Sequence, residues 1–134
     1  MPAITSMPWV TIVTVLALVQ FIAFGSLVSL ARGKYQVPAP AIIGNEVFER
    51  YFRVHMNTLE LLVVFVPALW LFALQVSANG AAGLGTVYLI GRLIYLRSYI
   101  RNPASRALGF GLSSLPILIM LAWVLFVAIR QLLV

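Results

Sequence analysis

Four long apolar runs constrain this chain more than any other feature of its sequence. Each approaches the ~20 residues that an α-helix needs to cross a bilayer, and 63% of the 134 residues are hydrophobic. A soluble domain of this length cannot bury so much apolar surface, because small domains hide a limited fraction of theirs. The sequence therefore predicts an all-α integral membrane protein, with residues 1–134 forming a single four-helix transmembrane bundle.

Capping residues, prolines and glycines mark the ends of the four helices. We expect helices over about residues 8–31, 46–76, 84–101 and 103–133. Ser6 is the expected cap of the first helix, and Gly33 follows its end. Asn45 is the expected cap of the second. The first run lacks a basic flank and a small-residue cleavage site, which favours a retained span over a signal peptide.

Basic residues concentrate in the two loops that join the first helix to the second and the third to the fourth. These are Arg32, Lys34, Arg50, Arg53, Arg97, Arg101 and Arg106. By the positive-inside rule both loops are cytoplasmic and both termini lie outside. The net charge of +6 is then explained by topology and by anionic membrane lipids, so we expect no nucleic-acid partner. The lack of a transit peptide suits a bacterial inner membrane, and equally an organellar one.

Residue usage argues against several kinds of chemistry. The absence of cysteine excludes thiolate catalysis and thiolate metal sites. One histidine and no aspartate leave too few ligands for a metal centre, so we expect none.

The second helix begins with a polar stripe that leads into its apolar part. All three acidic residues lie within EVFERYFRVHMNTLE, together with two arginines, an asparagine and the only histidine. At 100° per residue Arg53, Asn57 and Glu60 share one face, while His55 projects roughly opposite. Such a stripe is costly in lipid, so it should face protein or a water-filled cavity. We interpret it as the wall of a binding site.

The third helix carries a second patterned face, formed by Tyr88, Arg92, Tyr95 and Tyr99 at helical spacing. Arg106 follows in the expected first turn of the fourth helix, where the backbone already favours anions. A thiol held there would be shifted towards thiolate. An acidic, peptide-like ligand with one ammonium group would suit these side chains.

Two segments, FERYFRVHMNTLELL and GRLIYLRSYIRNPASRALGF, resemble the membrane-associated proteins in eicosanoid and glutathione metabolism (MAPEG). The pattern is most similar to the microsomal glutathione transferases and the cysteinyl-leukotriene synthase. The resemblance covers nearly the whole chain. It implies a homotrimer that binds glutathione as a co-substrate between neighbouring subunits, near one membrane face.

The resemblance also implies roles for individual residues. Glutathione would be held by one subunit through Arg53, Asn57, Glu60, Tyr95 and Tyr99, with Glu60 on its ammonium group. Arg32 would approach from the adjacent subunit, Arg106 would stabilise the thiolate as the catalytic residue, and Arg92 matches a site arginine. His55 occupies a site position where the synthase has glutamine, with packing or subunit contact as its alternative.

The implied activity is a glutathione transferase, with or without peroxidase activity, that acts on lipophilic electrophiles or lipid hydroperoxides in detoxification. A non-catalytic lipid-binding scaffold of the same family is the alternative. Individual residues have structural alternatives of their own. The arginines would then only set topology and bind headgroups, Asn57 and Glu60 would only join helices, and Tyr95 and Tyr99 would be interfacial aromatic residues. A channel is disfavoured because no charged path crosses the membrane between Glu60 and Arg92.

Overall fold

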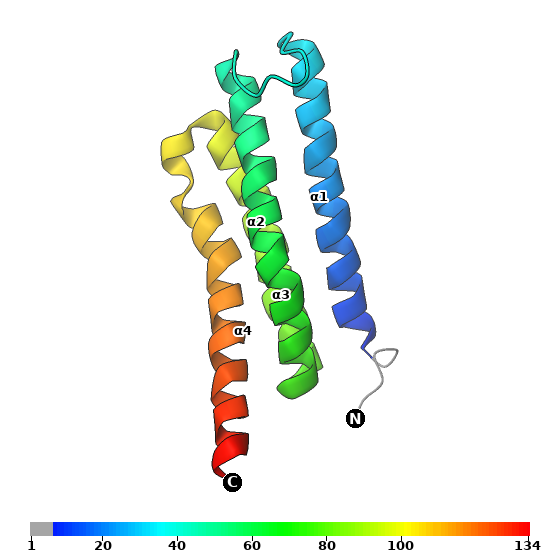
Figure 1. The fold of residues 1–134 in the computed structure, drawn as a ribbon, viewed down its shortest axis with the longest axis vertical. Coiled ribbons are helices and arrows are strands. Elements are labelled where there is room, and N and C mark those ends of the chain that lie inside the picture. Colours follow the sequence, from blue (N-terminus) through cyan, green and yellow to red (C-terminus); the bar gives the residue numbers. More distant parts are fainter. Residues whose placement is uncertain (1–6) are drawn as a thin grey trace.

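The computed structural model describes residues 7–134 and confirms the all-helical fold (Figure 1). Its elements are α1 (Pro8–Lys34), α2 (Glu46–Gln75), α3 (Ala78–Arg101), the 3-10 helix η2 (Pro103–Ser105) and α4 (Ala107–Leu133). Within residues 7–134, three segments are long and apolar enough to cross a membrane, namely α1, α2 and the stretch from Pro103 to Leu133. The remaining α-helix, α3, is not among them.

Within α1–α3, two helix ends differ from the sequence prediction by more than one residue. α1 continues through Gly33 to Lys34, and the N–H of Tyr35 closes it on Ala31. α3 begins at Ala78 instead of residue 84, because the Ser77 side chain accepts a hydrogen bond from the N–H of Gly80 and caps the helix earlier. The glycines after Ser77 therefore lie within a helix, where the sequence suggested a longer turn.

The structure tests one of the two caps predicted for the first two helices. Asn45 caps α2 as predicted, because its Oδ1 accepts hydrogen bonds from the N–H groups of Val47 and Phe48. Ser6, the predicted cap of α1, lies outside the described residues.

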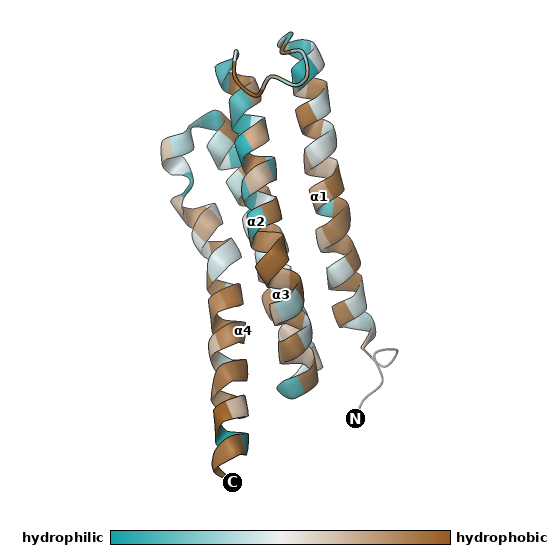
Figure 2. Cartoon of the chain, viewed as in Figure 1, coloured by the Kyte–Doolittle hydropathy of each residue, from teal (hydrophilic) through white to brown (hydrophobic). Residues whose placement is uncertain are grey.

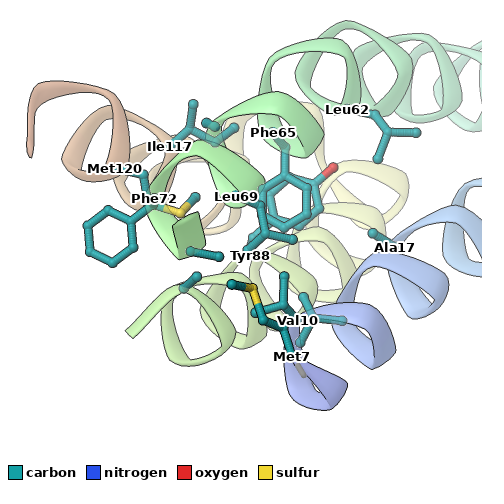
Figure 3. Close-up of a cluster of buried hydrophobic side chains, with 14 residues drawn as sticks. Met7, Val10, Ala17, Leu62, Phe65, Leu69, Phe72, Tyr88, Ile117 and Met120 are labelled. Carbon is teal, nitrogen blue, oxygen red and sulfur yellow. The ribbon is translucent and has the colours of Figure 1, made fainter. Parts of the chain in front are cut away.

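The helices α2 and α3 form the centre of the bundle. α1 packs against both of them, and α4 packs against them from the other side, most extensively along α3 (Figure 1). Aromatic and aliphatic side chains from all four helices meet in one core (Figure 3). At its middle the rings of Phe65 and Tyr88 stack with centroids 3.8 Å apart. All four α-helices thus contribute to this central cluster, and two smaller buried clusters lie apart from it.

Two side-chain hydrogen bonds join α1 to its neighbours inside this apolar region. Trp70 Nε1 donates to Thr14 Oγ1 at 3.0 Å, and Gln20 Nε2 donates to the carbonyl of Leu89 at 3.0 Å. Such bonds between helices stabilise membrane bundles, because few other partners exist in lipid. They fix the position of α1 along α2 and α3.

Polar residues gather at one end of the bundle (Figure 2). The α1–α2 connection and η2 lie at that end, while the start of α1 and the end of α4 lie at the other (Figure 1). The predicted placement of both basic loops on one side is therefore confirmed. That this side is cytoplasmic, and that the membrane is a bacterial inner membrane, stay predictions.

Candidate functional site

A pocket of about 940 Å³ opens at the polar end, between α2, α3 and the start of α4. Its lining residues are Arg53, Asn57, Tyr95, Tyr99, Ala104, Arg106, Ala107 and Phe110. Five of the predicted site residues thus meet in one pocket. None of the eight lining side chains is acidic, so the pocket favours an anionic group.

α2 contributes the two polar side chains of one wall. Arg53 and Asn57 lie four residues apart, so they share a face of this helix. Arg53 is exposed, which leaves its guanidinium available to a carboxylate, and such pairs are often bidentate. Asn57 is half-buried and lies deeper along the helix. The wall therefore offers a cation near the mouth and an amide below it.

The facing wall comes from α3, where the predicted tyrosine and arginine face is confirmed. Tyr88, Arg92 and Tyr95 are buried, and Tyr99 is half-buried. The rings of Tyr95 and Tyr99 lie with centroids 5.4 Å apart, and Phe110 of α4 lies 6.5 Å from Tyr95. These rings give the pocket an apolar surface with hydroxyl groups that can donate or accept hydrogen bonds.

Arg92 lies behind the pocket and is fully buried. Its Nε donates to Ser113 Oγ at 2.8 Å, and its Nη1 donates to Asn57 Oδ1 at 2.7 Å and to Thr58 Oγ1 at 3.3 Å. The guanidinium also lies over the ring of Tyr95, 4.3 Å from the centroid. All these partners are neutral, so Arg92 adds uncompensated positive charge beside the pocket.

Arg106 lines the pocket. The sequence predicted that it lies in the first turn of a helix starting at Pro103, and this prediction is wrong. Pro103–Ser105 forms a separate 3-10 turn, and Arg106 is the N-cap of α4, which begins at Ala107. The turn is held by Ser105, whose Oγ lies within hydrogen-bond distance of the carbonyls of Ser98 and Asn102. Arg106 is exposed and donates from Nη1 to the carbonyl of Pro103 at 3.2 Å.

The cap position still places Arg106 beside the first, unpaired N–H groups of α4. Both the guanidinium and the positive end of the helix dipole favour negative charge at that point. This end of the pocket therefore favours an anionic group.

Four predicted residues do not line the pocket of the single chain, namely Arg92, which lies behind it, and Arg32, His55 and Glu60. Arg32 donates from Nη1 to the carbonyls of Val37 and Ala41, and so holds the α1–α2 connection. His55 faces α1, where its ring stacks on Phe21 with centroids 4.6 Å apart. Glu60 is exposed on the face of α2 one turn beyond Asn57.

The two hydroxyl partners of Arg92 were not predicted from the sequence. Thr58 and Ser113 are fully buried, and Ser113 lies on a helix otherwise rich in apolar residues. A polar residue inside a membrane helix is itself a signal of function or helix contact. Phe110, which closes the pocket opposite Tyr95, carried no such signal because it resembles any lipid-facing aromatic residue.

Comparisons with known proteins agree with this architecture. Residues 10–126 match the model of the MAPEG family. An uncharacterised protein of Synechocystis is 41% identical over 128 residues, which cover 96% of this chain and 93% of the relative. Human microsomal glutathione S-transferase 2 is 38% identical over 101 residues, covering 75% and 69%. Bovine leukotriene C4 synthase is 33% identical over 94 residues, covering 70% and 63%.

Proposed function

The chain belongs to the MAPEG family, and we propose that it is a glutathione-dependent membrane transferase. It joins the glutathione thiolate to lipophilic electrophiles at the membrane face, or uses it to reduce lipid hydroperoxides. The names of two relatives, a microsomal glutathione S-transferase and a leukotriene C4 synthase, support a glutathione-dependent reaction. The observation that carries the proposal is the meeting of Arg53, Asn57, Tyr95, Tyr99 and Arg106 in one pocket.

The shape and charge of the pocket fit this chemistry. Arg53 binds a carboxylate of glutathione near the mouth, while Asn57 and the tyrosine hydroxyls bind its amide groups and the second carboxylate. The thiol lies beside Arg106 and the start of α4, where positive charge stabilises the thiolate. Catalysis follows from that stabilisation and from holding the thiolate next to the electrophile.

Glu60 and Arg32 complete the site in the proposed homotrimer. Glu60 is exposed on a membrane-spanning helix, and a carboxylate facing lipid is costly. A neighbouring subunit that covers this face, with the ammonium group of glutathione bound between them, removes that cost. Arg32 approaches from the neighbouring subunit, and its hydrogen bonds to Val37 and Ala41 keep it at the level of the polar end. His55, stacked on Phe21, supports the wall from the α1 side.

The lipophilic substrate arrives through the bilayer. α1 and α4 expose apolar side chains along most of their length, so membrane lipids surround the bundle and an apolar molecule can approach laterally. Glutathione, being water-soluble, enters from the polar end.

Calorimetry of glutathione binding to the detergent-purified protein tests the binding part of the proposal. We expect an affinity between micromolar and millimolar, reduced at least tenfold in Glu60→Gln. Glu46→Gln is the matched control, since Glu46 is exposed and, within residues 7–134, pairs only with Arg50 at 3.6 Å. No binding at millimolar glutathione, in protein shown to be folded, would instead favour the lipid-binding scaffold.

Turnover with a model electrophile tests the catalytic part. Arg106→Ala should reduce turnover by about 100-fold while largely sparing glutathione affinity, because the guanidinium acts on the thiolate. Arg101→Ala is the control, since Arg101 is exposed and does not line the pocket. Unchanged turnover in Arg106→Ala would remove this residue from the mechanism.

A further inference from the structure

Three polar side chains form a chain of hydrogen bonds that runs from α4 to the pocket. Ser113 Oγ accepts from Arg92 Nε at 2.8 Å, and Arg92 Nη1 donates to Asn57 Oδ1 at 2.7 Å. Ser113 and Arg92 are fully buried, whereas Asn57 lines the pocket. The chain therefore connects a residue that no ligand can touch with one that a ligand can touch.

Arg92 determines which way the amide of Asn57 points. A guanidinium has only donors, so the group it bonds in Asn57 must be the carbonyl oxygen. The amide nitrogen is then left to face away from Arg92, and Asn57 offers N–H groups to the pocket. A ligand group that binds at this position must accept hydrogen bonds, as a carboxylate or a carbonyl does.

Ser113 in turn determines how Arg92 is held. The hydroxyl of Ser113 donates its only proton to the carbonyl of Gly109 at 2.6 Å, so its lone pairs remain for Arg92 Nε. Within residues 7–134 the Nη2 atom of Arg92 is buried without a hydrogen-bond partner, and Thr58 accepts only a longer bond from Nη1. Ser113 is therefore the single acceptor that orients the Nε side of the guanidinium among the described residues.

We propose that Ser113 is a positioning residue for ligand binding, acting through Arg92 to hold the Asn57 amide with its N–H groups towards the ligand. This inference rests on the proposed function, because the ligand is taken to be glutathione. Without the Ser113 hydroxyl, the guanidinium has a second buried donor without a partner and turns to satisfy it. Asn57 then loses its fixed orientation.

The test is calorimetry of glutathione binding to Ser113→Ala, in the unchanged protein and in an Asn57→Ala background. Ser113→Ala should weaken binding about tenfold, since hydrogen bonds to charged groups are the strong ones. In the Asn57→Ala background the same change should have less than about a twofold effect, because the residue it positions is gone. A merely structural role would give the same loss in both backgrounds.

The neighbouring serine provides a matched control. Ser114 Oγ donates to the carbonyl of Phe110 at 2.7 Å, as Ser113 Oγ donates to Gly109. The hydrogen bonds of Arg92 within the described chain go to Ser113, Asn57 and Thr58, and not to Ser114. Ser114→Ala should leave glutathione affinity unchanged. Asn57→Asp adds a second readout, since a carboxylate still accepts from Arg92 but offers no N–H. It should bind glutathione no better than Asn57→Ala.

The outcomes separate this inference from the proposed function. If the unchanged protein binds glutathione and Ser113→Ala binds it equally well, the inference is overturned alone. Equal losses in the two backgrounds, or normal affinity in Asn57→Asp, would also overturn it. No binding by the folded, unchanged protein would overturn the proposed function and this inference together.

Discussion

The close contact between α3 and α4 allows a sharp test of how packing supports the site. At Gly109 the backbone of α4 lies so near to Tyr95 that an added Cβ would meet its N, Cα and Cβ atoms. The Cα would be 2.5 Å away, about 0.9 Å below the 3.4 Å at which ordinary contact begins. Tyr95 N and Cα are backbone atoms, so no side-chain rotation relieves the clash.

Two opposing terms set the effect of Gly109→Ala. Replacing glycine by alanine inside a helix gains about 0.5–1 kcal/mol of helix stability. Overpacking against a rigid neighbour costs about 1–3 kcal/mol, and here α3 and α4 must separate. We expect a net destabilisation of about 1–2 kcal/mol. Because Tyr95 lines the pocket, glutathione affinity should fall as well.

Gly111→Ala is the matched control on the same helix. Nothing lies within 4 Å of the Cβ that it adds, so only the gain in helix propensity remains. Denaturation in mixed detergent, followed by circular dichroism, would rank the two variants against the unchanged protein. Equal stability of Gly109→Ala and Gly111→Ala would refute the argument that Gly109 sets the helix spacing.

Three further predictions follow from individual contacts. Asn45→Ala removes the cap of α2 and should destabilise the protein by about 1 kcal/mol in the same denaturation assay; no change would mean that water replaces the cap. Trp70→Phe removes the hydrogen bond to Thr14 and should lower the free energy of unfolding by about 0.6 kcal/mol. Thr14→Val should lower it by a similar amount, and the double variant should lose less than the sum of the two. Arg92→Lys should lower glutathione affinity at least tenfold in calorimetry, because an ammonium cannot reproduce the paired geometry towards Ser113 and Asn57; normal affinity would show that charge alone suffices.

Part of the candidate site was readable from spacing along single helices. Arg53 and Asn57 share a face because they are four residues apart, as do Tyr95 and Tyr99, and the structure places all four in one pocket. The periodicity of a helix fixes these relations before any tertiary contact forms. The predicted start of the fourth helix at Pro103 was wrong, because Pro103–Ser105 forms a separate 3-10 turn and α4 begins at Ala107. Short 3-10 turns are frequent at the ends of α-helices, and a proline at the first helical position suits both.

Contacts between helices could not be read in this way. Nothing in the sequence indicated that Arg92 would bond Ser113, 21 residues away on another helix, instead of facing the ligand. Arg32 likewise donates to the carbonyls of Val37 and Ala41 only because the α1–α2 connection folds back over it. The number of residues between two side chains in the sequence does not predict these hydrogen bonds.

The sequence by itself determined that the chain is an all-helical membrane protein with its basic loops on one side. Apolar length, helix period and charge distribution are local properties, and the bilayer leaves a helical chain few other solutions. The tertiary structure decided which polar residues line the pocket and which lie behind it. That choice depends on the rotation and spacing of α2, α3 and α4, which are set by the close approach at Gly109 and by the buried bonds of Arg92.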